Sequence, residues 1–304
     1  MLDSPNRNWK KDAKVLNSNY QYESEDEFNF IDLRTTRSLF GLWSPKYIKD
    51  NYALIGDASS KIQQNQDDFE AYIIRANSKK ELKDYYGAIA DYKKSFEIAA
   101  LKKSDEYHRT RCYHDMLELH VHLHEFDYAL MGYSKLINDI GESLSYNYAN
   151  RASVKNHAGY YEGAINDYSE SLIIDSENIT AYFNRGLIKY EINDYDGAII
   201  DITQAIKLDK AYDSKYSNLE YYYWNRGNAY VGNEQYHKAI SDYTQSIKIS
   251  PYFEPSYRNR GFMYLKLGNI NDACEDFQMT KTIHLNRGED YSYIQEYIDT
   301  NCSP

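Results

Sequence analysis

Arginine and aspartate recur in this sequence at a fixed spacing of 16 residues, and this pattern has the clearest chemistry. Two interpretations are open: the arginines bind an anionic ligand, or each arginine pairs with its aspartate and joins two helices. One copy of the pattern has lost both charges together and has Met116 and Gly132 in their place. Because a partly buried charge is costly without its partner, this joint loss favours a structural pairing. The pairs are Arg75/Asp91, Arg151/Asp167, Arg185/Asp201, Arg226/Asp242 and Arg260/Asp276.

An asparagine stands directly before the arginine in four consecutive copies of the pattern. On a helical wheel it lies about 160° from the small residue that follows the arginine, which predicts an exposed strip. An amide both donates and accepts hydrogen bonds, so it can bind the backbone of an extended peptide without selecting a side-chain sequence. The alternative is that these side chains cap or bridge helices locally. We favour peptide binding, because all four share one strip: Asn150, Asn184, Asn225 and Asn259.

Histidines and carboxylates gather in residues 112–124, where His114, Glu118 and His122 follow one another at four-residue intervals beside Asp115. This spacing brings nitrogen and oxygen ligands to one flank of a helix, so a transition-metal site is one interpretation. We favour a solvated polar face, because two helical turns are too long a spread for one ion. The chain has no Gly-rich phosphate loop, nucleophile elbow, paired-cysteine motif or His-Glu-x-x-His sequence. We therefore expect no catalytic residues, no metal and no cofactor.

The helices that must position these side chains are predicted by a second spacing, of 12 residues, between a usually small residue and an alanine. Apolar residues at i, i+3, i+4 and i+7 predict two amphipathic helices in each copy. The copies follow one another at steps of 41, 35, 34, 41 and 34 residues, which is typical of a solenoid built from one repeated unit. A larger side chain would overpack the helix contact. The spaced pairs are Ala76/Ala88, Leu117/Ala129, Ala152/Ala164, Gly186/Ala198, Gly227/Ala239 and Gly261/Ala273, with Leu117 the large exception.

These units resemble the tetratricopeptide repeat family, whose 34-residue unit carries an aromatic residue, Gly or Ala, Tyr, Ala, an aromatic residue and Pro in that order. The resemblance implies an all-α, right-handed superhelical solenoid of six helix-turn-helix repeats with terminal capping helices. It also implies that the first helix of each unit lines a concave groove. Units one to six cover 69–102, 110–143, 145–178, 179–212, 220–253 and 254–287. Unit five matches the family at Tyr223, Gly227, Tyr230, Ala239, Tyr243 and Pro251.

We expect an extended peptide or partner segment to bind in the groove of units three to six, because units one and two have Ile74 and Asp115 in place of the asparagine. With neighbouring helices ~10 Å apart and a strand advancing ~3.3 Å per residue, one asparagine would serve about every third peptide residue. Aromatic and arginine side chains make good interface anchors, because they bury a large area at low entropic cost. The further residues expected to bind are Asn228, Tyr146, Tyr221, Trp224, Arg258 and Lys266.

Three other segments surround the repeats of residues 69–287. Residues 1–35 lack periodicity and carry acidic and aromatic residues, which predicts a flexible or partner-dependent arm. Residues 36–68 are expected to form an N-terminal helical cap, or a degenerate repeat. Residues 288–304 are expected to form a capping helix and tail, with Ile294 and Ile298 facing inward.

Composition bounds the partner and the compartment. The 46 acidic and 35 basic side chains give a net charge of −11, which disfavours nucleic acid and favours a neutral or basic protein partner. No run approaches the ~18 apolar residues of a membrane span, and the start lacks the apolar core of a secretory signal. We therefore expect no membrane insertion and a cytoplasmic location. The odd number of cysteines, Cys112, Cys274 and Cys302, predicts reduced thiols.

Together these patterns predict a non-catalytic protein-interaction module or scaffold. One alternative is a structural subunit that uses its outer faces or ends in a fixed assembly. A weaker alternative is a metal-dependent regulator that acts through unit two. Association with further copies of the same chain is compatible with each of these classes.

Overall fold

The computed structural model describes residues 45–101, 106–140, 144–212 and 218–302. Within these ranges the chain is helical, with short turns between the helices and no β-strand. All of the described helices belong to one compact unit, Thr36–Pro304. The predicted arm of residues 1–35 and the part of the predicted cap before Pro45 lie outside the described residues.

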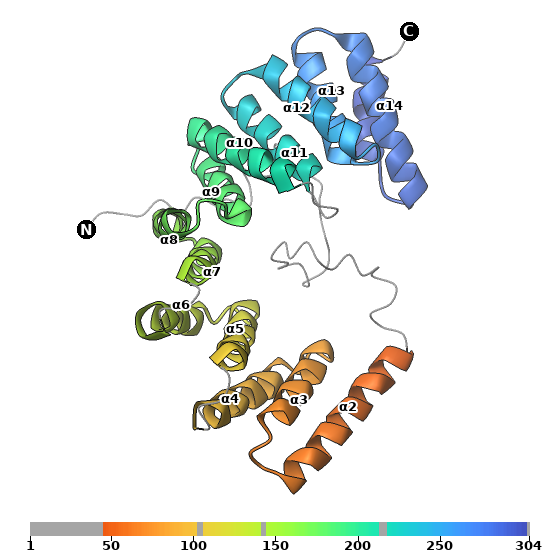
Figure 1. The fold of residues 1–304 in the computed structure, drawn as a ribbon. Coiled ribbons are helices and arrows are strands. Elements are labelled where there is room, and N and C mark those ends of the chain that lie inside the picture. The colour runs from red at the N-terminus through yellow and green to blue at the C-terminus, as the bar shows by residue number, and fades with distance from the viewer. Residues whose placement is uncertain (1–44, 102–105, 141–143, 213–217, 303–304) are drawn as a thin grey trace, which may run out of the picture. The chain divides into compact units, whose positions relative to one another are not determined.

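In the described residues, helix α2 (Pro45–Gln64) precedes six consecutive helix pairs, which follow the predicted units closely, although α5 begins four residues before unit two (Figure 1). A π-helix, η1 (Leu136–Ile140), extends the second helix of unit two, and α15 (Ser292–Asn301) follows unit six. In the described part of the chain, no helix is long and apolar enough to span a bilayer. The pairs are α3 (Phe69–Glu81) with α4 (Tyr85–Leu101), α5 (Glu106–His122) with α6 (Phe126–Lys135), α7 (Leu144–His157) with α8 (Tyr161–Ile174), α9 (Ile179–Glu191) with α10 (Tyr195–Tyr212), α11 (Leu219–Gly232) with α12 (Tyr236–Ile249), and α13 (Glu254–Lys266) with α14 (Ile270–Arg287).

The helices pack mainly on their neighbours along the chain. Each helix contacts the next one, and the first helices of units three, four and five also contact each other, α7 with α9 and α9 with α11. The core is accordingly divided into local clusters, one of which joins Tyr168 of α8 to Ala152 of α7 and Ile188 of α9. This pattern of contacts is that of a repeat protein, so the predicted all-α repeat fold is confirmed.

The small residues lie where the two helices of a unit approach most closely, as the sequence predicts. A Cβ atom added at Gly227 would lie 2.6 Å from the ring of Tyr243, and one added at Gly261 would lie 2.7 Å from the ring of Phe277. Both distances are too short for carbon atoms in contact. The recurrence of a small residue therefore follows from the packing of a second-helix side chain over it.

In unit two the large and small side chains of this contact are exchanged between the two helices. Its first helix carries Leu117 where the other units have a small residue, and the side chain of Leu117 lies over Gly132. A Cβ atom at Gly132 would lie 2.2 Å from the Leu117 Cδ2 atom, which leaves no room for an aspartate. Leucine and aspartate thus exclude each other here, and Met116 replaces the arginine that has lost its partner.

The C-terminal helix α15 packs on unit six through Ile294 and Ile298, which are 0% and 6% exposed, as predicted for a cap. The prediction of reduced thiols is wrong for two cysteines, because Cys274 of α14 and Cys302 form a disulfide with their Cα atoms 5.6 Å apart. The turn after α14 folds α15 back and brings the two residues together despite a separation of 28 residues. Cys112 is a buried free thiol.

Candidate interaction face on the first helices

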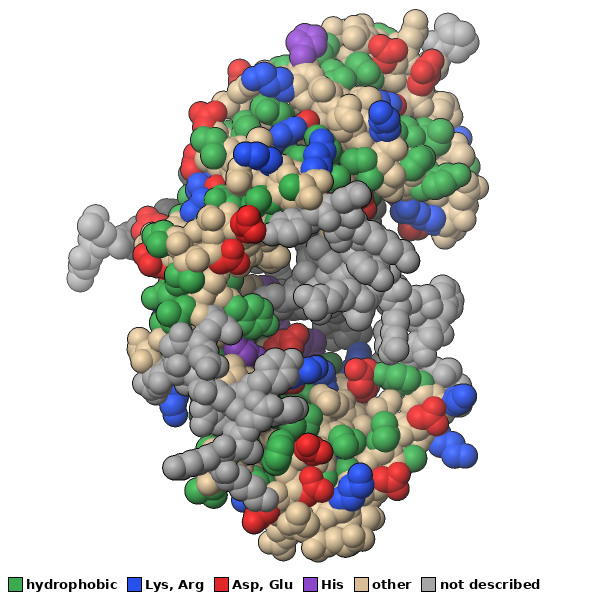
Figure 2. All heavy atoms as spheres, in the orientation of Figure 1, with side chains coloured by type: hydrophobic (Ala, Val, Ile, Leu, Met, Phe, Trp, Pro, Cys, Tyr) green, Lys and Arg blue, Asp and Glu red, His purple; other side chains and the backbone are tan. Residues whose placement is uncertain are grey.

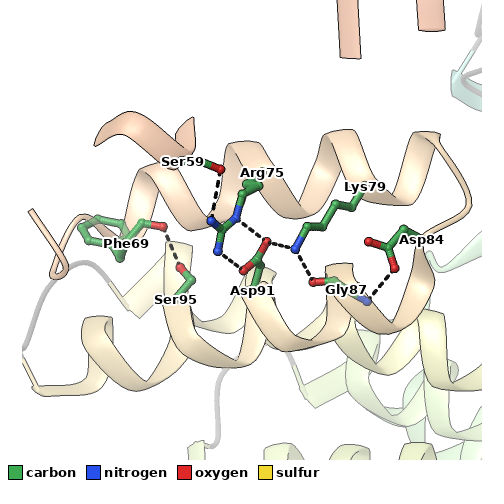
Figure 3. A network of polar contacts seen from close by, with 8 residues as sticks. All are labelled: Ser59, Phe69, Arg75, Lys79, Asp84, Gly87, Asp91 and Ser95. Carbon is green, nitrogen blue, oxygen red and sulfur yellow. Dashed lines mark hydrogen bonds and ion pairs between the residues drawn. The ribbon is translucent and has the colours of Figure 1, made fainter. Parts of the chain in front are cut away.

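Each paired arginine joins three helices. In unit one, Arg75 on α3 donates from Nε and Nη2 to the two carboxylate oxygens of Asp91 on α4, at 2.8 and 2.6 Å. Its Nη1 atom donates to the hydroxyl of Ser59 on α2 at 3.2 Å (Figure 3). The four other arginines bind their aspartates in the same way, and their Nη1 atoms donate to Ser134, Ser169, Thr203 and Thr244 of the preceding second helix.

These contacts confirm the structural pairing of arginine with aspartate. The carboxylates are buried, with side chains between 2 and 6% exposed. In units one, three and four a lysine one turn after the arginine adds a second cation, as Lys79 does for Asp91 at 2.8 Å (Figure 3). Units five and six have no such lysine; there burial raises the pKa of Asp242 and Asp276, opposed by Arg226 and Arg260. Because three nitrogens of each guanidinium are bound inside the fold, the arginines are not placed to bind a separate anion.

The four asparagines lie on α7, α9, α11 and α13, and this strip is called the first-helix face below. The expectation that they are exposed is wrong in degree, because all four are half-buried. The reason is visible at unit six, where Asn259 donates from Nδ2 to Oδ1 of Asn228 at 2.9 Å. The same oxygen accepts a hydrogen bond from the buried hydroxyl of Tyr243 at 2.8 Å. Asn228 and Asn259 thus bridge units five and six.

Asn184 has the corresponding position between units three and four. Asn184 and Ser153 both lie near the hydroxyl of Tyr168. Burial raises the pKa of Tyr168 to about 12, and these two polar side chains oppose the rise. The local alternative named from the sequence, a bridge between helices, agrees with the hydrogen bond that Asn259 makes to Asn228.

Asn150 and Asn225 differ from the other two. The Nδ2 atom of Asn225 donates to the carbonyl oxygen of Tyr221 in its own helix at 2.9 Å, and its Oδ1 atom has no partner among the described residues. Asn150 has no side-chain hydrogen bond within the described part of the chain. Unit four, which precedes Asn225, has Leu187 and Ile202 at the positions of Asn228 and Tyr243. It therefore has no buried tyrosine hydroxyl next to Asn225.

The sequence contains a signal for this network of asparagines and tyrosine hydroxyls, which the helical-wheel argument does not use. Two positions change together from unit to unit. The first directly follows the small residue of the first helix, and the second directly follows the aspartate of the second helix. Where the first is polar the second is tyrosine, and where the first is apolar the second has no hydroxyl. The combinations are Asn77/Tyr92, Glu118/Tyr133, Ser153/Tyr168, Leu187/Ile202, Asn228/Tyr243 and Phe262/Phe277.

Two tyrosines predicted to bind a partner are exposed on the first-helix face. Tyr146 on α7 is 55% exposed, with its ring 5.0 Å from that of His114. Tyr221 on α11 is 41% exposed, with its ring 4.8 Å from that of Phe253. Trp224 is half-buried against Phe253, and its Nε1 atom has no hydrogen-bond partner among the described residues.

The two predicted cations lie in different surroundings. Lys266 at the end of α13 is exposed, with Nζ 4.4 Å from the ring centre of Tyr236. Arg258 is only 9% exposed and its Nε atom lies 3.6 Å from Glu254, which is fully buried. Arg258, which was expected to bind the partner, is therefore buried and neutralises a buried carboxylate.

The histidines of unit two do not form a metal site in the described part of the chain, where no group of three His, Cys, Asp or Glu residues is placed to hold an ion. The ring of His114 lies between those of Tyr133 and Tyr146, and both of its nitrogens are buried without a partner. Burial lowers the pKa of His114 to about 4. His122 packs against Tyr85 instead.

Figure 2 shows one face of the molecule, on which basic, acidic and apolar side chains are interspersed over the described elements. No single-sign charged area covers that view, in agreement with the placement of the five arginines in internal pairs. The face does not have the massed basic surface that a nucleic-acid backbone requires.

The fold is similar to that of several solved proteins. A crystal structure of MamA matches with a TM-score of 0.52 at 21% identity, covering 57% of this chain and 96% of that one. BtubC from P. vanneervenii matches with a TM-score of 0.57 at 18% identity, covering 67% and 89%. The APC/C hetero-tetramer Cut9–Hcn1 matches with a TM-score of 0.57 at 13% identity, covering 83% and 46%. Among curated proteins, none is similar to this chain in sequence.

Family sequence models identify the repeats themselves. A model described as tetratricopeptide repeat matches residues 69–100, 179–212 and 220–253, which correspond to units one, four and five. A second model, described as TPR repeat, matches residues 157–193. The first three matches coincide with helix pairs, and the match at 157–193 spans α8 and α9, the second helix of unit three and the first helix of unit four. The chain therefore contains tetratricopeptide repeats.

Proposed function

We propose that this chain is a non-catalytic protein-interaction module that binds an extended segment of a partner protein on the first-helix face of units three to six. The observation that supports this most directly is the pairing of exposed tyrosines with asparagines on that face, at Tyr146 and Asn150 and at Tyr221 and Asn225. Aromatic rings supply contact area and amides supply backbone hydrogen bonds. The partner is neutral or basic, because the chain carries a net charge of −11.

The fold neighbours are consistent with a role in assemblies, since the Cut9–Hcn1 structure is a hetero-tetramer. This neighbour is also consistent with the second candidate function, that of a structural subunit that uses its outer faces. Large apolar side chains are exposed on second helices, including Tyr128 and Met131 of α6 and Ile200 of α10. Contacts at these residues would fix a neighbouring subunit rather than bind an extended segment.

The compartment is a separate question. We predict a cytoplasmic location from the sequence, but the Cys274–Cys302 disulfide favours an oxidising environment. Fractionation of the source cell into its compartments, followed by detection of the chain with an antibody, distinguishes the two.

The test of the proposed function uses a random library of twelve-residue peptides, selected on the wild-type chain. One selected peptide, labelled with fluorescein, is titrated with two variants that carry the same new charge. Tyr221→Arg alters the first-helix face, and Ile200→Arg alters the outer face of α10, where Ile200 is 67% exposed. We expect Tyr221→Arg alone to weaken binding. A selection without binders, or loss of binding only in Ile200→Arg, would contradict the proposal.

A further inference from the structure

We propose that only two of the four asparagines, Asn150 and Asn225, bind the partner's backbone, and that they do so as two matching Tyr–Asn pairs about six peptide residues apart. This inference rests on the proposed function and narrows it to a ligand class. The ligand is an extended protein segment with two bulky apolar side chains about six residues apart, both on one side of the strand.

The first step is that Asn184 and Asn259 are already occupied. Asn259 donates to Asn228, whose oxygen also accepts from Tyr243, and Asn184 lies near the buried hydroxyl of Tyr168. Turning Asn259 toward a ligand would break its hydrogen bond to Asn228, and turning Asn184 would take a polar neighbour away from the buried hydroxyl of Tyr168. A new hydrogen bond to a ligand would only replace the interaction that is lost.

The second step is that Asn225 has been released by changes in the preceding unit. Unit four has Ile202 where units three and five have tyrosine, and Leu187 where they have Ser153 and Asn228. Both members of the bridging network are therefore apolar before Asn225. Its Oδ1 atom has no partner among the described residues, so the amide keeps an unused acceptor.

Asn150 is free for a different reason. The preceding unit does provide Tyr133, but the residue that would complete the network is Glu118. Within the described residues, no hydrogen bond joins Asn150 to Tyr133. The donor and the acceptor of the Asn150 amide are both available for a peptide group.

The third step is independent of hydrogen bonding. Four residues before each free asparagine, one helical turn away, stands an exposed tyrosine: Tyr146 before Asn150 and Tyr221 before Asn225. The equivalent residues before the two occupied asparagines are Thr180 and Pro255. An exposed ring thus accompanies the free amide in units three and five and is absent from units four and six.

The spacing of the two pairs defines the ligand. They lie two units apart, on α7 and α11, with α9 between them and in contact with both. Two steps of ~10 Å between helices give ~20 Å, which an extended strand covers in about six residues. Because side chains alternate along a strand, residues six apart face the same side, so two side chains of one segment can each contact a tyrosine.

The experiment measures affinity and melting temperature for four single variants, with the labelled peptide selected on the wild-type chain. We expect Asn150→Ala and Asn225→Ala to weaken binding by about fivefold each, with an unchanged melting temperature. The matched controls Asn184→Ala and Asn259→Ala should lower the melting temperature and change the affinity less than about twofold. Equal loss of affinity in all four variants, or unchanged affinity in Asn225→Ala, overturns the inference.

A reverse variant tests the same point without removing any group from the face. Leu187→Asn combined with Ile202→Tyr rebuilds the network of unit five inside unit four, so Asn225 should become occupied. We expect a higher melting temperature and a peptide affinity close to that of Asn225→Ala. An affinity equal to that of the wild type overturns the inference. If Tyr221→Arg still abolishes binding, the proposed function stands and only this inference fails.

Discussion

At the scale of single residues, the arginine before the small position is the residue that connects successive units. Its planar guanidinium reaches the two oxygens of one carboxylate and, with a third nitrogen, a hydroxyl of the preceding helix. A lysine in its place has a compact charge and cannot hold this geometry. The serine or threonine two residues after the aspartate position is therefore as much a part of the repeat as the charged pair.

Unit two shows which residues can replace this pair, and the same replacements can be made in another unit. In unit four, Arg185→Met alone leaves the buried Asp201 with Lys189 as its remaining cation and should lower the free energy of unfolding by about 3 kcal/mol. Adding Gly186→Leu and Asp201→Gly reproduces the leucine-over-glycine packing of Leu117 and Gly132. We expect the triple variant to recover most of the loss in urea denaturation. A triple variant less stable than Arg185→Met would contradict the exchange.

His114 predicts a dependence of stability on pH. Burial lowers its pKa to about 4, from 6.5 in an unfolded chain. Between these values the unfolded chain binds a proton that the folded chain does not, so stability is lost as the pH falls from 6.5 toward 4. The free energy of unfolding should drop by at most about 3 kcal/mol from this residue.

The comparison variant is His114→Phe, which keeps a ring between Tyr133 and Tyr146. Its urea denaturation curves should change less than those of the wild type between pH 6.5 and 4, because carboxylates contribute equally to both chains. Parallel pH dependences would show that His114 is not buried in its neutral form.

Residue-level chemistry was predictable where two changes occurred together in one unit. The joint loss of arginine and aspartate at Met116 and Gly132 predicted their contact correctly. Helical-wheel position alone predicted too much exposure for all four asparagines, because it takes no account of groups from the neighbouring unit, such as Asn228 beside Asn259. The joint change to Leu187 and Ile202 in unit four is the sequence signal for these neighbouring groups.

At the scale of helices, the two ends of the described stack are incomplete units. Helix α2 acts as the second helix of a unit, since its Ser59 binds Arg75 as Ser169 binds Arg185. Helix α15 stands where the first helix of a seventh unit would, but it has Ile294 in the place of the arginine, one step of 34 residues after Arg260. The disulfide Cys274–Cys302 therefore holds a helix that lacks the usual polar connection.

Reduction of that disulfide should loosen α15. Closing a loop across a separation of 28 residues stabilises the folded form by about 3.6 kcal/mol in the chain-entropy description. We expect the amides of α15 to exchange faster with deuterium in Cys302→Ser than in the oxidised wild type, while those of α11 stay unchanged. A reducing agent should affect the wild type and leave Cys302→Ser as it is. Equal exchange in the oxidised and reduced wild type would contradict a role for the disulfide.

The helices were predictable because packing imposes a spacing on the sequence. A small residue must recur wherever Tyr243 or Phe277 lies over the first helix, and this marks each pair of helices. The cysteines give no comparable signal, because their pairing depends on the direction that the chain takes after α14. An odd count with one buried thiol, Cys112, made the remaining two difficult to interpret from the sequence.

At the scale of the whole molecule, contacts between neighbouring helices leave each unit dependent on its own interfaces. Among the described units, unit two has the weakest interfaces, since it lacks the arginine–aspartate pair and buries His114 without hydrogen bonds. Its second helix also ends in a π-helix, η1. A stack of this kind opens where its interfaces are weakest.

Native-state hydrogen exchange tests this expectation. The amides of α5 and α6 should exchange faster than those of α7 to α12, by about tenfold or more if the local free energy of opening is lower by about 1.4 kcal/mol. Introducing the Arg–Asp pair at Met116 and Gly132, together with Leu117→Gly, should slow the exchange of α5 and α6. Uniform exchange across units one to five would contradict a weak second unit.

The most direct test of the central claim is to locate the bound peptide. A peptide selected on the wild-type chain is resynthesised with photoreactive benzoyl-phenylalanine at each of its apolar positions in turn, irradiated with the protein, and the attached residues are identified by mass spectrometry. We predict cross-links to α7 and α11 near Tyr146 and Tyr221, from peptide positions about six residues apart. Cross-links concentrated on α6, α10 or another second helix would contradict the first-helix face and favour the assembly-subunit alternative.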